Sequence, residues 1–295
     1  MKKFAKYLLI TLSTMALANE KVLIFTHCHN RPEFIEMQVK CFKAFIKDDY
    51  EFVVFNDAPN QSMCDAIVQT CQRLNIKCMR VPQNRPAHRE TPSYRHMDGI
   101  RFALNTIGFD HDGIVFMIDS DMFPVKPFSV NEYMKGYDIA GDEQFRPCQG
   151  PKKVVYISPL TVFMNMKTLP NKKAIDFTGD KVEGESCDVG GHLYYYFKAN
   201  PKVKLKFTKV NCIAALSDDA KAVNQLDDRT KSFLKTLKQS FDANDPHRMQ
   251  FHVDQTFIHY VAGSNWNHRS PSYHQKKTRL LTNFIDESIK YYQTK

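Results

Sequence analysis

One stretch constrains the fold of this chain more than any other. Five apolar residues, 114–118, lead without a break into Asp119 and Asp121. A short apolar run bounded by Gly113 and Pro124 is typical of a buried β-strand. Acidic residues are costly beside such a core unless they are paired. Because residues two apart on a strand point to the same side, both carboxylates can reach one cation. Oxygen ligands suit Mg²⁺ or Mn²⁺. The alternative is two surface acids in a turn.

Strand-like and helix-like patterns alternate before this stretch. The predicted strands cover residues 21–26, 51–56 and 76–81, and the predicted helices cover 33–46, 63–74 and 94–107. This alternation predicts an α/β fold whose mainly parallel sheet is covered on both faces. Ligands of such sheets bind at the carboxyl ends of the strands. Thr26, Asp57, Asp119 and Asp121 are all expected at such ends.

The second half of the chain is less regular. Residues 138–141, 154–164 and 251–261 have strand-like patterns, and the polar range 217–250 is interpreted as a peripheral helical insertion. A closing helix is expected around residues 280–289. No linker or repeat divides the chain, so residues 19–295 are predicted to form a single domain.

The first 18 residues have the pattern of a secretory signal. Lys2, Lys3 and Lys6 precede a short apolar stretch that ends in the small-residue sequence 16–18. This pattern predicts a cleaved signal peptide and a mature protein in the secretory pathway, the periplasm or the extracellular space. An uncleaved membrane anchor is the alternative, although the apolar stretch is short for a bilayer span.

Charge and cysteine patterns narrow the range of partners. The formal net charge is +9, and three of these positive charges lie in residues 1–18. A moderately basic chain suits an anionic ligand such as a nucleotide, or peripheral contact with an anionic membrane surface. The sequence contains no Lys/Arg-rich run that would indicate nucleic-acid binding. The eight cysteines include no Cys-x-x-Cys pair, which argues against a zinc or thiol-redox motif.

The order of these parts resembles the GT-A glycosyltransferases, enzymes with the nucleotide-diphospho-sugar transferase fold. The resemblance covers most of residues 21–267, and the segments that carry it are 26–32 (Thr-His-Cys-His-Asn-Arg-Pro), 55–57 (Phe-Asn-Asp), 118–121 (Ile-Asp-Ser-Asp), 188–191 (Asp-Val-Gly-Gly) and 258–266 (Ile-His-Tyr-Val-Ala-Gly-Ser-Asn-Trp). It implies a GT-A-like α/β sandwich that moves a hexose-type sugar from a nucleotide-diphospho-sugar to an acceptor hydroxyl. The acceptor would be a carbohydrate, a lipid-linked molecule or a protein.

The resemblance also implies a metal site. Asp119 and Asp121 match the Asp-x-Asp motif, and His259 matches a late histidine that serves as a third Mn²⁺ ligand in related enzymes. Asp121 is the expected direct ligand. Asp119 is expected to bind the metal, directly or through water, or to hold the ribose of the donor. A divalent ion at this position stabilises the charge that develops on the leaving diphosphate.

Further residues are predicted around the donor. Thr26, Arg31 and Asp57 follow strands that end at the same sheet edge, and they are expected to line one cleft with Asp121. Arg31 is expected to pair with a phosphate, or else to form a loop salt bridge. Asp57 is expected to bind the base or ribose, or else to cap a turn. Arg95 is expected to reach the diphosphate or Asp119, with a helical ion pair as the alternative.

Two acids compete for the role of base on the acceptor side. Asp188 precedes two glycines, where the backbone can approach a sugar closely, and Asp254 lies near His259 in the sequence. Either could instead cap a helix. Trp266, the only tryptophan, could stack on a sugar or belong to the core.

Three other functions share some of these features. A haloacid-dehalogenase-type phosphatase also uses an Asp-x-Asp after a strand, but it expects Thr or Val where this chain has Phe123. A sugar nucleotidyltransferase shares the fold, but it normally carries a glycine-rich loop after the first strand. A non-catalytic carbohydrate-binding protein would not need Asp119, Asp121 and His259 together.

Overall fold

The structure is a computed structural model that describes residues 20–294, except 148–152, 209, 213–222, 243, 244, 246 and 265–268. The predicted signal peptide, residues 1–18, therefore lies outside the described residues. Within the described part of the chain, no helix combines the length and the apolar character that a membrane span requires.

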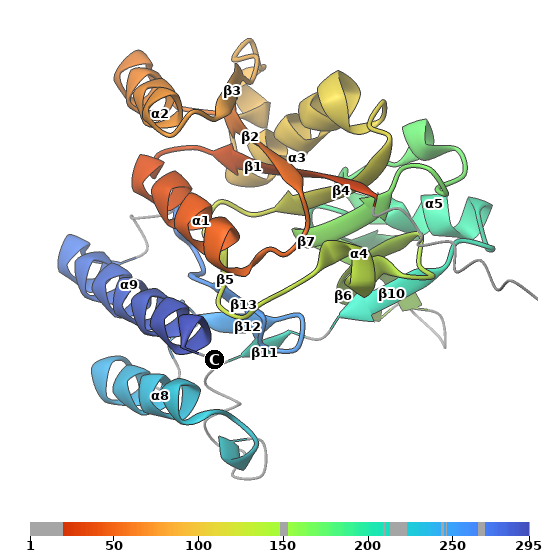
Figure 1. Ribbon diagram of the computed structural model, residues 1–295. Helices are drawn as coiled ribbons and strands as arrows, with labels where there is room; N and C mark the ends of the chain where they lie inside the picture. The colour runs from red at the N-terminus through yellow and green to blue at the C-terminus, as the bar shows by residue number, and fades with distance from the viewer. Residues whose placement is uncertain are drawn as a thin grey trace, which may run out of the picture.

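A seven-stranded sheet forms the centre of the molecule (Figure 1). In spatial order its strands are β10 (Leu205–Thr208), β6 (Ile139–Pro147), β7 (Lys153–Asn165), β4 (Gly113–Ile118), β1 (Lys21–Cys28), β2 (Tyr50–Asn56) and β3 (Lys77–Arg80). Strand β7 runs antiparallel to its two neighbours, whereas the other pairs in the sheet are parallel. The predicted mixed α/β class with a mainly parallel sheet is therefore confirmed.

Strand β4 is buried on both faces. Val115 and Met117 belong to the hydrophobic core on one face of the sheet, and Ile114, Phe116 and Ile118 belong to the core on the other. Successive side chains of a strand point to opposite faces, so a strand that is covered on both sides is apolar throughout. The acids that follow β4 are thus attached to a rigid central strand.

Helices cover both faces of the sheet. Helices α3 (Pro92–Ala103) and α5 (Leu193–Ala199) pack into one core. Helices α1 (Pro32–Phe45), α2 (Gln61–Arg73) and α4 (Val130–Met134) pack into the other. The remaining short elements are the 3-10 helices Ala87–Arg89 and Lys172–Ala174, a π-helical turn at Leu104–Gly108, and the two-stranded ribbon of β8 (Lys181–Val182) and β9 (Glu185–Ser186).

A smaller antiparallel sheet lies beside the central one. Its order is β11 (Asn211–Cys212), β12 (Gln250–His252), β13 (Phe257–His259) and β5 (Met122–Pro124). Helices α8 (Asp228–Ser240) and α9 (Pro271–Gln293) share a third core with this sheet and α1. Helix α9 contacts both α1 and α8, as Figure 1 shows. Because β5 follows directly on the residues after β4, the small sheet joins the C-terminal part of the chain to the end of the central strand.

The predicted strand at residues 251–261 is in fact a hairpin. Strands β12 and β13 pair across a turn in which Val253, Asp254 and Gln255 have φ values of 48°, 51° and 65°. Left-handed backbone at three successive positions cannot continue a strand, and the turn contains no glycine or proline that would mark it in the sequence. Helix α8 occupies part of the predicted helical range 217–250, and it packs on α9.

Candidate metal centre

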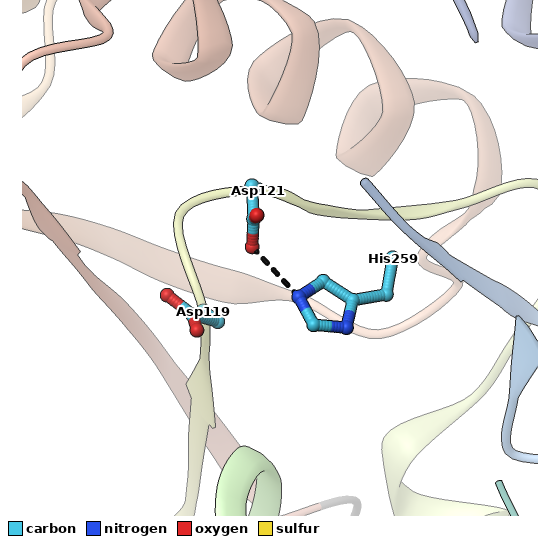
Figure 2. Close-up of side chains that lie close together, drawn as sticks. All are labelled: Asp119, Asp121 and His259. Carbon is cyan, nitrogen blue, oxygen red and sulfur yellow. Dashed lines mark ion pairs between the residues drawn. The ribbon is translucent and has the colours of Figure 1, made fainter. Parts of the chain in front are cut away.

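The two sheets bring three potential ligands to one point. Asp119 and Asp121 lie between β4 and β5, where the chain passes from the central sheet to the small one. Strand β5 pairs with β13 in a register that places Met122 opposite His259. Figure 2 shows the carboxylates of Asp119 and Asp121 and the imidazole of His259 close to one another. The juxtaposition therefore follows from the pairing of two segments that are far apart in the sequence.

The geometry of this cluster suits a cation. Ligand atoms of Asp119, Asp121 and His259 lie within 4.8 Å of one another. Asp121 Oδ1 and His259 Nε2 are 3.1 Å apart, yet their alignment is outside hydrogen-bond geometry, and Oδ1 is buried without another hydrogen-bond partner. Two carboxylates and one imidazole form a mixed donor set that Mn²⁺ accepts, and the carboxylates alone suit Mg²⁺. These residues therefore fit a divalent ion.

The backbone of the segment after β13 orients Asp121. Gly263 N–H donates a hydrogen bond of 2.7 Å to Asp121 Oδ2, and Tyr260 N–H donates one of 2.8 Å to the Asp121 carbonyl. A Cβ atom at Gly263 would lie 2.6 Å from Asp121 Cβ and 2.8 Å from a ring carbon of Phe34. Only glycine allows this close approach, which leaves Oδ1 of Asp121 directed at His259.

Charge interactions set the protonation of the cluster. Burial raises the pKa of the Asp119 carboxyl, and the charge of Asp121 raises it further. Burial would also raise the pKa of Asp121, but His259 and the Gly263 N–H outweigh it, so that this pKa is lowered. Burial alone would lower the pKa of His259, but the charge of Asp121 reverses the direction. These shifts favour a charged Asp121 carboxylate beside a protonated His259, and a cation that binds there would displace the proton of His259.

A cavity of about 410 Å³ opens onto the cluster. Its wall contains Asp119, Asp121 and His259 together with Ala262 and Gly263. It also contains residues from the end of β1, from the loops after β1 and β2, and from α3, notably His27, His29, Asp57, Arg95 and His96. The volume falls within the range typical of small-molecule sites. The wall combines a carboxylate cluster with an arginine and several histidines, which suits a ligand that carries both a metal-bound and a free anionic group.

Asp57 and Arg95 line the cavity as one unit. Arg95 Nε donates to Asp57 Oδ2 at 3.1 Å, and a terminal nitrogen of Arg95 donates to the Asp57 carbonyl at 2.7 Å. The other carboxylate oxygen accepts hydrogen bonds from Arg85 and Gln83. Arg95 also pairs with Glu90 at 3.0 Å. Both oxygens of Asp57 are thus engaged, and its contacts position Arg95 in the cavity wall.

The structure places Arg31 and Thr26 elsewhere. Thr26 is fully buried within β1, and Arg31 is only 3% exposed and packs on the Phe34 ring at 3.8 Å. Neither is among the described residues that line the cavity. Arg31 forms an ion pair with Glu33, the loop salt bridge that was the alternative to phosphate binding.

The two candidate bases, Asp188 and Asp254, are also absent from the described residues that line the cavity. Asp188 is exposed, and its Oδ1 accepts the Val189 N–H at 2.7 Å. Asp254 is exposed in the turn between β12 and β13, whereas His259 is at the opposite end of β13. Trp266 lies outside the described residues.

Sequence reasoning gave no role to His27 or His96, which line the cavity together with His259. His27 belongs to the end of β1, and its ring lies 5.9 Å from that of His96 on α3. Gly99 makes room for it, because a Cβ there would lie 2.9 Å from the His27 ring. His27 lies in the segment 26–32 that carries the family resemblance, but His96 does not lie in any of these segments, and the proximity of the two rings depends on the packing of α3 against β1.

His27 is expected to make the protein less stable in mild acid. Burial, reinforced by the charge of His96, lowers the pKa of His27 to about 3. Below pH 6.5 the unfolded chain binds a proton there that the folded protein does not bind until about pH 3, so stability is lost as the pH falls through this interval. At pH 5 the free energy of unfolding should be lower than at pH 8 by on the order of 2 kcal/mol.

The measurement is urea unfolding without divalent ions at pH 8 and pH 5. His27→Asn should show a pH-dependent loss smaller than that of the wild type by about this amount. His88→Asn, a substitution at an exposed position, should retain the wild-type pH dependence. Equal losses in His27→Asn and the wild type would contradict the prediction.

Comparison of the sequence with models of known protein families and with curated proteins found no match. The geometry of the site therefore provides the evidence on function.

Proposed function

We propose that this protein is a divalent-metal-dependent glycosyltransferase that uses a nucleotide-diphospho-sugar donor. The observation that carries the proposal is the convergence of Asp119, Asp121 and His259 at the wall of a cavity at the carboxyl end of β4. Such ends are where open α/β sheets bind ligands. The resemblance to GT-A enzymes supports the same assignment, since these three residues are the ones that match its metal motif.

Each part of the cavity has a role in this proposal. Asp119, Asp121 and His259 would hold Mn²⁺ or Mg²⁺, which supplies charge stabilisation for the diphosphate that leaves the sugar. Arg95 lies in the same wall, paired with Asp57 and Glu90, and would contact the anionic donor by exchanging its Glu90 partner for a phosphate. The buried Asp57 carboxylate holds Arg95 in place. Asp188 and Asp254 have no assigned role, because neither lies in the described cavity wall.

A donor screen tests the proposal. The purified protein is incubated with sugar nucleotides that carry uracil or guanine bases, with Mn²⁺ or with a chelator, and the release of nucleoside diphosphate is measured. We expect slow Mn²⁺-dependent hydrolysis of at least one donor, because glycosyltransferases that lack an acceptor transfer the sugar to water. Two further incubations test the alternative functions. One contains a phosphomonoester, the substrate of a phosphatase, and the other contains a sugar phosphate together with a nucleoside triphosphate, the substrates of a nucleotidyltransferase. Turnover of only one of these would instead favour a phosphatase or a nucleotidyltransferase.

A further inference from the structure

The segment that follows β13 is held in an unusual backbone conformation. Val261 and Ala262 have φ values of 65° and 59°. Left-handed backbone is rare for residues other than glycine, and especially so for a β-branched residue such as valine. Such a conformation persists only where the surroundings enforce it. The next residue is Gly263, whose N–H contacts Asp121.

Two buried basic side chains contact the carbonyls of this segment. Lys277 of α9, which is 1% exposed, donates a hydrogen bond of 3.1 Å to the Val261 carbonyl and another to the His247 carbonyl. Arg31 donates one of 3.1 Å to the Gly263 carbonyl. The Arg31 guanidinium is a charged donor, and hydrogen bonds from charged donors are stronger than those between neutral groups.

Other interactions fix the two basic side chains themselves. The Arg31 guanidinium lies over the Phe34 ring and donates to Thr278 Oγ1 at 3.2 Å. The Lys277 Nζ atom lies 4.1 Å from the centre of the Tyr260 ring. Both side chains therefore have ring contacts and hydrogen bonds in addition to those that they make to the segment. These additional contacts restrain Arg31 and Lys277, which in turn restrain the carbonyls of Gly263 and Val261.

We propose that Arg31 and Lys277 are positioning residues for the metal site. They hold the carbonyls of Gly263 and Val261, so that the Gly263 N–H fixes Asp121 Oδ2 and leaves Oδ1 directed at His259. Neither side chain lies in the described cavity wall, so both act through Asp121 rather than on the ligand. The inference rests on the proposed metal site, whose ligands it orients.

Metal affinity in folded variants tests the inference. Lys277→Met keeps a linear side chain of similar size but removes both hydrogen bonds, and Arg31→Lys keeps the charge but presents fewer donors. Each should weaken Mn²⁺ binding about tenfold, the lower end of the effect of outer-shell partners. Gly263→Ala should weaken it at least as much, because its Cβ would displace the carboxylate of Asp121.

The controls separate positioning from stability. Lys276→Met and Arg279→Lys make the same changes at exposed positions on α9 and should leave Mn²⁺ affinity unchanged. Near-ultraviolet circular dichroism confirms that each variant is folded, and Arg31→Lys and Gly263→Ala provide the test if Lys277→Met does not fold. A purely structural role would lower the melting temperature without changing the Mn²⁺ affinity of the folded protein, and that result would overturn the inference. Failure of the wild type to bind Mn²⁺ would overturn the proposed function as well.

Discussion

Replacing Asp121 with asparagine is expected to weaken Mn²⁺ binding by a factor on the order of 100 or more, and to abolish metal-dependent donor hydrolysis. The loss of an outer-shell partner already costs ten- to a hundredfold in metal affinity, so the loss of a charged ligand should cost at least the upper value. Asn can still accept the Gly263 N–H that reaches Oδ2. The fold should therefore tolerate the substitution. Isothermal titration with Mn²⁺ measures the effect, and thermal unfolding reports the stability.

The structure offers two matched controls for this variant. Asp188 and Asp254 are exposed acids outside the described cavity wall. Asp188→Asn and Asp254→Asn should each bind Mn²⁺ as tightly as the wild type. Unchanged affinity in Asp121→Asn would contradict the metal assignment. Lost donor hydrolysis in Asp188→Asn at unchanged affinity would instead restore Asp188 as a base.

Replacing His259 with alanine should also weaken Mn²⁺ binding, by roughly ten- to a hundredfold, because one of three ligands is removed. Its backbone pairing with Met122 does not depend on the side chain. The strand pairing should therefore survive, and the loss of stability should be limited to the removed ring and its contact with the Asp121 carboxylate. Mn²⁺ titration and thermal unfolding of the same preparation measure the two effects.

His252 provides the contrasting variant. Its ring lies 5.4 Å from that of His259 in the same hairpin, but its Nδ1 is 2.8 Å from Asp142 Oδ2 at a fully buried position. His252→Ala leaves a buried carboxylate without one of its partners, which is costly. It should therefore destabilise the protein more than His259→Ala and weaken Mn²⁺ binding less. The reverse ranking would show that His259 is mainly a core residue.

Local sequence patterns were sufficient to predict the central part of the fold. The uninterrupted apolar run of β4 indicates a strand that is buried on both faces, and the alternation of patterns indicates a parallel sheet. Asp119 and Asp121 could be found for the same reason, since they follow this run directly. The hairpin of β12 and β13 was missed, because its turn consists of residues that do not usually adopt left-handed backbone.

Contacts between distant segments could not be predicted in the same way. His259 was selected only through the family resemblance, since its proximity to Asp121 depends on the pairing of β13 with β5. Arg31 follows a strand in the sequence, which suggested a place in the cleft. In the structure α9 packs against α1 and Arg31 contacts Thr278 and Gly263 instead. The role of Lys277 depends on the same packing and has no sequence signal.

The measurement that tests the central claim most directly is Mn²⁺ titration of the wild-type protein with and without uridine or guanosine diphosphate. Because the free nucleotides also bind Mn²⁺, the same titrations of Asp121→Asn provide the reference that is subtracted. If the three ligands and the diphosphate share one ion, the protein should bind a single Mn²⁺, and one of the nucleotides should tighten that binding at least about tenfold, a coupling of about 1.4 kcal/mol. Absence of Mn²⁺ binding to the wild type, or an affinity that neither nucleotide changes, would contradict the account.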